Sequence, residues 1–312
     1  MKKLFIALSI MLCLGVVLTG CGNSKQAKSN KVRIVATNFA AYDFARQVGG
    51  TKAEVELLLP PGTESHSFEP TPREIKKIAA AQVFVCAGGE SEEWVDKLLA
   101  SVGNKETKVI KMMECVPTVE EVVSEGMQGN KKHTDEVEYD EHVWTAPTNA
   151  LLIVGKINKT LQAVDAANAT VYQQQTEAYT KQLTQLDQDF RHIVATGKRK
   201  TLVFGDRFPF RYFVDAYGLK YFAAFPGCAH DTEASAATLA FLINKVKTER
   251  IPVVLHTELS NEKVADIICE ATGATKKEFN ACHNVTKEQM NNGVTYVDLV
   301  QQNAKVLKEA LN

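Results

Sequence analysis

Two stretches with a common layout decide the fold, "TNFAAYDFARQVGG" at residues 37–50 and "GDRFPFRYFVDAYG" at residues 205–218. Each follows a short apolar segment rich in β-forming residues, and each predicts an aromatic-rich helix that is closed by glycine. Each is followed by another strand-like segment and by a Pro-Gly loop that carries a histidine, His66 in the first case and His230 in the second. This repeat predicts two lobes of similar structure.

Strands and helices alternate through both halves of the chain, which is typical of a parallel sheet covered by helices. Residues 147–196 are compatible with helix almost throughout, with a break near residues 165–168. We therefore predict an α/β fold of two similar lobes joined by one long, rigid backbone helix. Because ligands bind outside the carboxyl ends of strands in such sheets, the cleft between the lobes is the expected site. The predicted strands are residues 32–37, 55–59, 83–86, 108–112, 201–204, 221–225 and 253–256.

The N-terminus, "MKKLFIALSIMLCLGVVLTGC", combines two lysines with a short apolar run that stops at small residues. This pattern is typical of a secretory signal rather than of a membrane-spanning helix. Its end, Leu-Thr-Gly-Cys, resembles the lipobox of bacterial lipoproteins, in which Cys21 would carry the lipid. The predicted organisation is a lipoprotein signal peptide (1–20), the lipidated Cys21 with a flexible tether (21–31), a first lobe (32–146) with an acidic loop expected to be mobile (114–141), linking helices (147–197) and a second lobe (198–312).

The net charge of the chain bears on which partners it can bind. The chain of 312 residues has a formal net charge of −1, so nucleic acid is not an expected partner.

An exported compartment permits disulfides, and five cysteines remain once Cys13 of the signal and Cys21 are set aside. An odd number leaves at least one thiol unpaired. Cys228 and Cys282 both lie in loops expected near the cleft, so they are a possible disulfide pair.

Two histidines stand where a loop leads into a helix. His66 lies in "LLLPPGTESHSFEPTP", between two proline-stiffened flanks, and His142 lies in "YDEHVWTAPTNA". Proline reduces the entropy lost when such a loop adopts one shape, which suits a ligand that is already positioned. Neutral imidazole binds divalent first-row metals, so the pair indicates a metal site. His192, within the long helix, and His133, in the acidic loop, are expected to be solvated.

Six longer segments resemble one family, the metal-binding lipoproteins of bacterial zinc and manganese ABC importers (ZnuA/TroA-like), some of which are also described as adhesins. The Pro-Gly-Thr-Glu-x-His and Asp-x-His-Val-Trp motifs are specific, and the resemblance covers nearly the whole mature chain. It implies the two-lobed fold and assigns His66 and His142 as the first two metal ligands. The segments are residues 35–50, 57–85, 140–150, 204–219, 223–235 and 258–274.

The second lobe departs from the family pattern. The resemblance implies a third ligand, often histidine, after the first strand of this lobe, but Gly205 stands there. A fourth ligand, usually a carboxylate, is expected late in the lobe, where "FNACHNV" offers His283. Either Asp206 replaces the third ligand or it comes from elsewhere. The candidates in the second lobe are therefore His283 first, then Asp206, followed by His230 and Glu258.

The resemblance implies an extracytoplasmic protein that captures Zn²⁺ and delivers it to an ABC permease with its ATPase. The chain is expected to be a monomer held at the cell membrane by its N-terminal lipid. A site rich in nitrogen ligands favours zinc, although Mn²⁺ or another divalent metal is an alternative cargo, and surface adhesion is an alternative role. A zinc hydrolase needs a general base beside an open coordination position, and no His-Glu-x-x-His motif occurs, so enzymatic activity is not expected.

Overall fold

The computed structural model describes residues 31–63, 68–102, 106–127, 137–229 and 233–312. The predicted signal peptide, the lipidation site Cys21 and the tether up to residue 30 lie outside these residues. Within the described part, no helix is both long enough and apolar enough to cross a bilayer. Residues Val32–Asn312 form one compact body.

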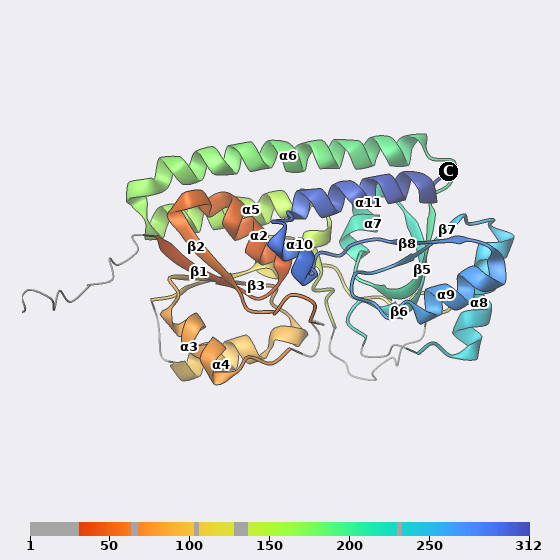
Figure 1. The fold of residues 1–312 in the computed structure, drawn as a ribbon, viewed down its shortest axis with the longest axis horizontal. Helices are drawn as coiled ribbons and strands as arrows, with labels where there is room; N and C mark the ends of the chain where they lie inside the picture. The colour runs from red at the N-terminus through yellow and green to blue at the C-terminus, as the bar shows by residue number, and fades with distance from the viewer. Residues whose placement is uncertain (1–30, 64–67, 103–105, 128–136, 230–232) are drawn as a thin grey trace, which may run out of the picture. The chain divides into compact units, whose positions relative to one another are not determined.

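The first sheet contains four parallel strands in the order β2-β1-β3-β4 (Figure 1). The helices α2 and α5 lie on one face of it, and α3 and α4 lie on the other. Phe39 and Phe44 of α2 are fully buried against the sheet, and burying each such side chain contributes roughly 1.5–3 kcal/mol. The strands are β1 (Val32–Ala36), β2 (Ala53–Leu57), β3 (Val83–Cys86) and β4 (Lys108–Lys111), and the helices are α2 (Phe39–Gly49), α3 (Pro72–Ala80), α4 (Trp94–Val102) and α5 (Pro147–Val164).

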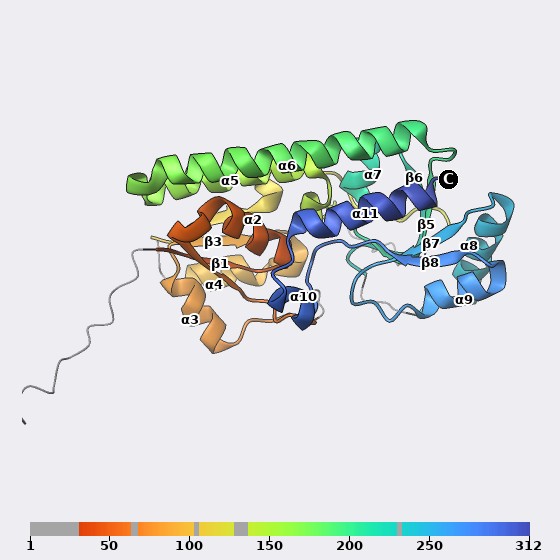
Figure 2. The same cartoon turned by 45° about the horizontal axis from the view of Figure 1, so that its top comes forward.

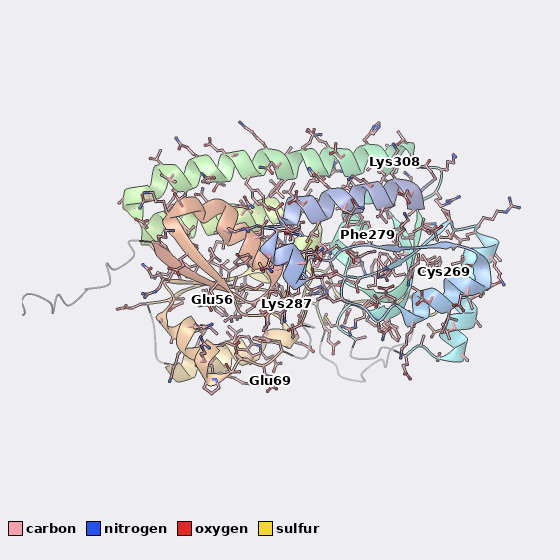
Figure 3. All side chains as sticks on the ribbon, in the orientation of Figure 1. Glu56, Glu69, Cys269, Phe279, Lys287 and Lys308 are labelled. Carbon is pink, nitrogen blue, oxygen red and sulfur yellow. The ribbon has the colours of Figure 1, made fainter. Side chains whose placement is uncertain are left out.

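The second sheet repeats this order as β6-β5-β7-β8, again with every pair parallel. One face is covered by α7 and α11 and the other by α8 and α9 (Figure 1). Phe279, which Figure 3 labels, follows β8 in this lobe, and its ring packs edge-on against Phe210 and Phe213. Its elements are β5 (Thr201–Phe208), α7 (Arg211–Tyr217), β6 (Lys220–Pro226), α8 (Ala236–Thr248), β7 (Val253–His256), α9 (Lys263–Thr272), β8 (Thr275–Glu278), α10 (Lys287–Asn291) and α11 (Tyr296–Ala310). Two similar lobes are confirmed.

A long helix joins the two sheets. Helix α6 (Ala169–Thr196) has 28 residues, follows α5 after the short 3₁₀ turn Ala166–Asn168, and extends past both sheets in both views (Figures 1 and 2). Its buried stripe includes Leu183, Leu186 and Phe190, and it contacts α2 and α5 as well as α7 and α11. The predicted linking helix and its break are therefore confirmed.

The two described arms of the acidic loop pair with each other. The N–H of Glu121 donates to the carbonyl of Glu138 at 2.9 Å, and the N–H of Asp140 donates to the carbonyl of Val119, also at 2.9 Å. The second arm ends directly before His142. A short antiparallel pairing of their backbones joins these arms, and the mobility of the loop stays a prediction.

Candidate metal centre

His142 is fixed by the aspartate two residues before it. Oδ1 of Asp140 accepts the backbone N–H of His142 at 2.8 Å and lies 3.0 Å from its Nδ1. The imidazole is 1% exposed, and the chain turns at this residue into the short 3₁₀ segment Val143–Thr145. A carboxylate on Nδ1 fixes the ring orientation and directs Nε2 away from Asp140, which is how metal-binding histidines are usually held.

His283 is held in a similar way by Glu258. Oε1 of Glu258 accepts the backbone N–H of His283 at 2.9 Å and lies 3.7 Å from its Nδ1, while Oε2 accepts the N–H of Ala281 at 2.6 Å. His283 lies between β8 and α10, and Glu258 follows β7. Both histidines thus have a carboxylate that accepts their own backbone N–H. At Nδ1 the carboxylate forms a hydrogen bond with His142 and a longer contact, of 3.7 Å, with His283.

The imidazole rings of His142 and His283 pack against each other. Their ring centroids are 4.8 Å apart at an interplanar angle of 77°. Trp144 packs edge-on against His283 with centroids 5.2 Å apart, and its Nε1–H donates to the carbonyl of Ala281 at 2.8 Å. Residues 142 and 283 are far apart in the sequence, so tertiary structure alone creates this pair.

The loop that carries His283 is bonded to both lobes. At the start of α2, the N–H groups of Phe39 and Ala40 donate to the carbonyls of His283 and Cys282 at 2.8 and 3.1 Å. The first N–H groups of a helix have no partner within the helix, so these carbonyls satisfy two of them. Because Glu258 holds the same loop from the second lobe, residues 281–285 form a bridge between the lobes.

Burial and nearby charges shift the pKa of His142 in opposite directions. Burial lowers the pKa of the imidazole, but the carboxylate of Asp140, with Glu141 and Glu121 further away, raises it more, so the pKa lies above its ordinary value. Binding of a dication requires the neutral ring, so protons compete with metal at this residue. The same carboxylates favour a dication over a neutral ligand.

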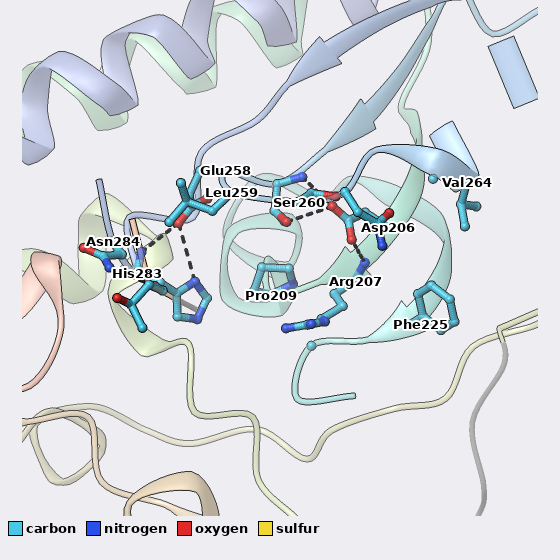
Figure 4. Close-up of a pocket in the computed structure, with 15 residues that line it drawn as sticks. Asp206, Arg207, Pro209, Phe225, Glu258, Leu259, Ser260, Val264, His283 and Asn284 are labelled. Atoms are coloured by element: carbon cyan, nitrogen blue, oxygen red, sulfur yellow. Dashed lines mark hydrogen bonds and ion pairs between the residues drawn. The ribbon is translucent and has the colours of Figure 1, made fainter. Parts of the chain in front are cut away.

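Two cavities open at the histidine pair, and His283 lines both. The smaller one, of about 40 Å³, is also lined by His142, Trp144 and Glu92. Burial, and to a smaller extent the charge of Glu141, raises the pKa of Glu92 to about 7. The larger cavity, of about 200 Å³, lies on the side of the second lobe (Figure 4). Both are formed by segments that follow strands of the two sheets, as expected for ligand sites in parallel α/β folds.

His66, His133 and His230 lie outside the described residues. The residues that flank the His66 segment are described: Thr63 lines the larger cavity and Phe68 lines the smaller one. Nδ2 of Asn284 donates to the carbonyls of Pro60 and Thr63, each at 2.8 Å. The end of the loop at Thr63 is therefore tied to the residue after His283.

The structure places Glu258 beside Nδ1 of His283, whereas Asp206 lines the larger cavity and holds the chain at Thr257 and Arg207. The carboxylate of Asp206 accepts the N–H and the hydroxyl of Thr257 at 2.9 and 2.8 Å and the N–H of Arg207 at 2.8 Å. Within the described ranges, no three His, Cys, Asp or Glu side chains form a group suited to holding a metal ion. The two carboxylates expected as possible ligands hold loops in this structure.

The glycine at position 205 has a packing reason. A Cβ added there would lie 2.5 Å from Cα of Ala265 in α9, so no side chain fits. The register of β5 against β6 shifts between Phe204 and Arg207, and such bulges redirect the side chains that follow. Asp206 and Arg207, at this bulge, both line the larger cavity.

The possible disulfide between Cys228 and Cys282 is not formed, and both thiols are free. Cys282 is fully buried in the main hydrophobic core, whereas Cys228 follows β6 and donates its N–H to Glu121. The sequence indicated that both cysteines lie in loops near the cleft. It did not show that Cys282, unlike Cys228, is part of the main hydrophobic core. It also missed Glu92 and Arg207 as lining residues. Glu92 lies shortly after β3 and Arg207 lies near the end of β5, and this placement is the only signal for them that the sequence offers.

Comparison with known proteins identifies the family. The profile of ZnuA, "Zinc-uptake complex component A periplasmic", matches residues 34–310. Zinc-binding lipoprotein AdcA of Streptococcus pneumoniae R6 is 33% identical over 99% of this chain, which spans 61% of AdcA. The high-affinity zinc uptake system protein ZnuA of Bacillus subtilis 168 is 29% identical, with 100% of this chain and 99% of that protein covered.

Solved structures agree with this comparison. The Zn(II)-bound ZnuA-like domain of Streptococcus pneumoniae AdcA has a TM-score of 0.75 at 30% identity and covers 90% of this chain and 99% of its own. The metal-dependent lipoprotein YcdH of Bacillus subtilis has a TM-score of 0.77 at 28% identity, covering 90% and 100%. The resemblance inferred from the sequence is confirmed, and the chain belongs to the ZnuA family of periplasmic zinc-uptake components.

Proposed function

We propose that this protein is the extracytoplasmic metal-binding component of an ABC importer, which captures Zn²⁺ and delivers it to a membrane permease. The observation that carries the proposal is the pairing of two imidazole rings, with centroids 4.8 Å apart and a carboxylate beside Nδ1 of each. Relatives named as zinc-binding and zinc-uptake proteins support zinc as the cargo.

His142 and His283 are the proposed ligands within the described residues, and His66 is the proposed third. Two facts support His66: its loop is bonded to Asn284, and its flanking residues line both cavities. Three nitrogen ligands and one further position suit the tetrahedral preference of zinc. Manganese prefers more oxygen ligands, so the set favours zinc over manganese.

The protein's own residues explain how the cargo would be held and released. Asp140 holds the ring of His142 and Glu258 holds the backbone of His283 before metal arrives, so little ordering entropy is lost on binding. Protonation of His142 opposes binding, and its raised pKa means that this competition begins at a higher pH than for an ordinary histidine. Docking on the permease, with anchoring by Cys21, completes the proposed cycle.

Calorimetric titration tests the proposal directly. The chelator-stripped protein is titrated with Zn²⁺ and, separately, with Mn²⁺, and the His142→Ala and His283→Ala variants are treated in the same way. We expect one zinc site in the wild type, with each variant weakened by at least about 100-fold because a ligand is lost. His192→Ala, on the exposed surface of α6, is the matched control and should bind as the wild type does.

The outcomes separate the alternatives. Tighter binding of Mn²⁺ than of Zn²⁺ would show a manganese carrier. Unchanged zinc binding in both alanine variants would refute the site, whatever the transported metal.

A further inference from the structure

Two buried tyrosines of the second lobe donate hydrogen bonds to the backbone on either side of His142. The hydroxyl of Tyr212, in α7, donates to the carbonyl of Asp140 at 2.8 Å. The hydroxyl of Tyr296, the first residue of α11, donates to the carbonyl of Trp144 at 2.7 Å. The two acceptors stand two residues before and two residues after the proposed ligand, so helices that cover the second sheet hold the chain on both sides of it (Figure 1).

Both tyrosines are themselves fixed. The hydroxyl of Tyr212 also accepts the N–H of Val119 at 3.2 Å. The backbone N–H of Tyr296 donates to Oδ2 of the fully buried Asp43 at 2.9 Å, and its ring packs edge-on against Phe44. Burial raises the pKa of Tyr212 to about 12 and the pKa of Tyr296 well above its ordinary value, so both hydroxyls keep the proton that they donate.

Trp144 links the backbone held by Tyr296 to both imidazoles. Its ring packs against that of His142 with centroids 5.7 Å apart and against that of His283 with centroids 5.2 Å apart. Its Nε1–H donates to the carbonyl of Ala281, two residues before His283. A displacement of the Trp144 backbone would therefore be passed to both proposed ligands.

The first lobe holds the same stretch, the His142 segment (residues 140–144), from the other side. The carboxylate of Glu141 accepts the N–H of Ser91 at 2.7 Å, and the segment leads directly into α5. Metal–ligand distances tolerate only about 0.2 Å. The bonds from the second lobe must therefore hold His142 at the correct distance from His283, which belongs to that lobe.

We propose that Tyr212 and Tyr296 are positioning residues for zinc, which hold His142 in register with the ligand of the second lobe. Each acts through a backbone carbonyl rather than on the metal itself. Removal of either hydroxyl takes a donor from a buried carbonyl, which is costly, and the segment then shifts toward another partner. This inference rests on the proposed function and adds two residues to the structure that holds the cargo.

Two variants that keep the aromatic ring test the proposal. Tyr212→Phe and Tyr296→Phe each remove one hydroxyl, and the matched control is Tyr172→Phe. Tyr172 is also buried, and its hydroxyl donates to Asp165 at 2.7 Å at the turn between α5 and α6. Helix α5, whose 18 residues span about 27 Å, separates this turn from the His142 segment.

Zinc affinity and stability are measured on the same proteins, the first by competition with a chromophoric chelator and the second by urea unfolding. Zinc affinity should fall about tenfold in Tyr212→Phe and in Tyr296→Phe, the lower end of the range for losing a group that supports a metal ligand. It should stay within about twofold in Tyr172→Phe. The urea midpoint should fall in all three, because each loses a buried hydrogen bond.

A double-mutant cycle shows whether Tyr212 acts through His142. In a His142→Ala background the ring is gone, so adding Tyr212→Phe should leave the remaining zinc affinity unchanged within about twofold. A residue that only supports the fold would lower the affinity in both backgrounds.

Other results would overturn the inference. Wild-type zinc affinity in both tyrosine variants would refute the positioning role and leave the proposed function intact, and wild-type affinity in one would refute the role of that tyrosine. A tenfold loss in Tyr172→Phe as well would show that affinity follows overall stability, which also refutes the role. A further tenfold loss on adding Tyr212→Phe to His142→Ala would exclude action through that ring. Failure of the wild type to bind zinc at all would instead refute the proposed function.

Discussion

The absence of a side chain at Gly227 is what allows the second lobe to approach His142. Gly227 follows β6, and a Cβ added there would lie 2.8 Å from Cε1 and 3.0 Å from Nδ1 of the imidazole. Gly227 does not have a positive φ, so alanine is compatible with its backbone. The added Cβ would also lie 3.1 Å from the backbone carbonyl oxygen of Phe208, so Gly227→Ala crowds the ring most and the end of β5 to a smaller extent.

The size of the effect follows from these distances. Ordinary van der Waals contact begins at 3.4 Å, so the ring and the new methyl group must separate by 3.4 − 2.8, or about 0.6 Å. The ring cannot yield freely, because Asp140 holds Nδ1 and His283 packs against it. Metal–ligand distances tolerate only about 0.2 Å, so zinc affinity should fall roughly 10- to 100-fold, as when a supporting partner of a ligand is lost.

The assay is competition for zinc between the apo protein and a chromophoric chelator. Gly155→Ala is the control, because nothing lies within 4 Å of its added Cβ. In the middle of α5 this change should leave zinc affinity unaltered and stabilise the helix by about 1 kcal/mol at most. If Gly227→Ala were folded and bound zinc within about twofold of the wild type, His142 could not be a ligand in the position described.

Three further changes test the surroundings of the pair. Asp140→Asn should lower zinc affinity about 10- to 100-fold, measured by the same competition, because an amide supports the imidazole less well than a carboxylate; unaltered affinity would contradict this role. Glu92→Gln should remove a pH dependence of stability. The pKa of Glu92 is raised from 4.5 to about 7, so the apo protein loses at most about 3 kcal/mol as the pH rises through this window, and urea unfolding at pH 5 and pH 8 should show the loss in the wild type but not in the variant. Trp144→Phe should lower the free energy of unfolding by about 1–3 kcal/mol, because the buried carbonyl of Ala281 loses its donor; equal urea midpoints would show that this bond is unimportant.

Much of the fold was predictable because local patterns and tertiary structure agree. Residues 83–86 and 253–256 were predicted as strands with their observed bounds, since both are short apolar runs buried on two faces. Strand β8 was missed because "TKKE" contains no apolar residue. It pairs with β7 alone at the edge of the sheet, where charged side chains are expected.

The site was predictable in part. The position of His142 after a loop indicated a metal ligand, the resemblance to the family pointed to His283 in "FNACHNV", and the structure brings these two together. The role of Asp206 was harder to foresee, because its carboxylate is turned toward Thr257 by a bulge in β5, and bulges leave no clear pattern in the sequence. Partners such as Glu258 and Ala281 depend on contacts between loops, which no local pattern encodes.

The bridge of residues 281–285 has a consequence for how the molecule melts. Two sheets could in principle lose their structure one after the other. Here the carbonyls of Cys282 and His283 complete the first turn of α2, and Glu258 in the other half holds the same residues. Loss of either half would expose unsatisfied backbone groups in its neighbour, which is costly, so both halves should denature in one cooperative step. Cargo bound at His283 would then protect the entire body, including strands far from the ion.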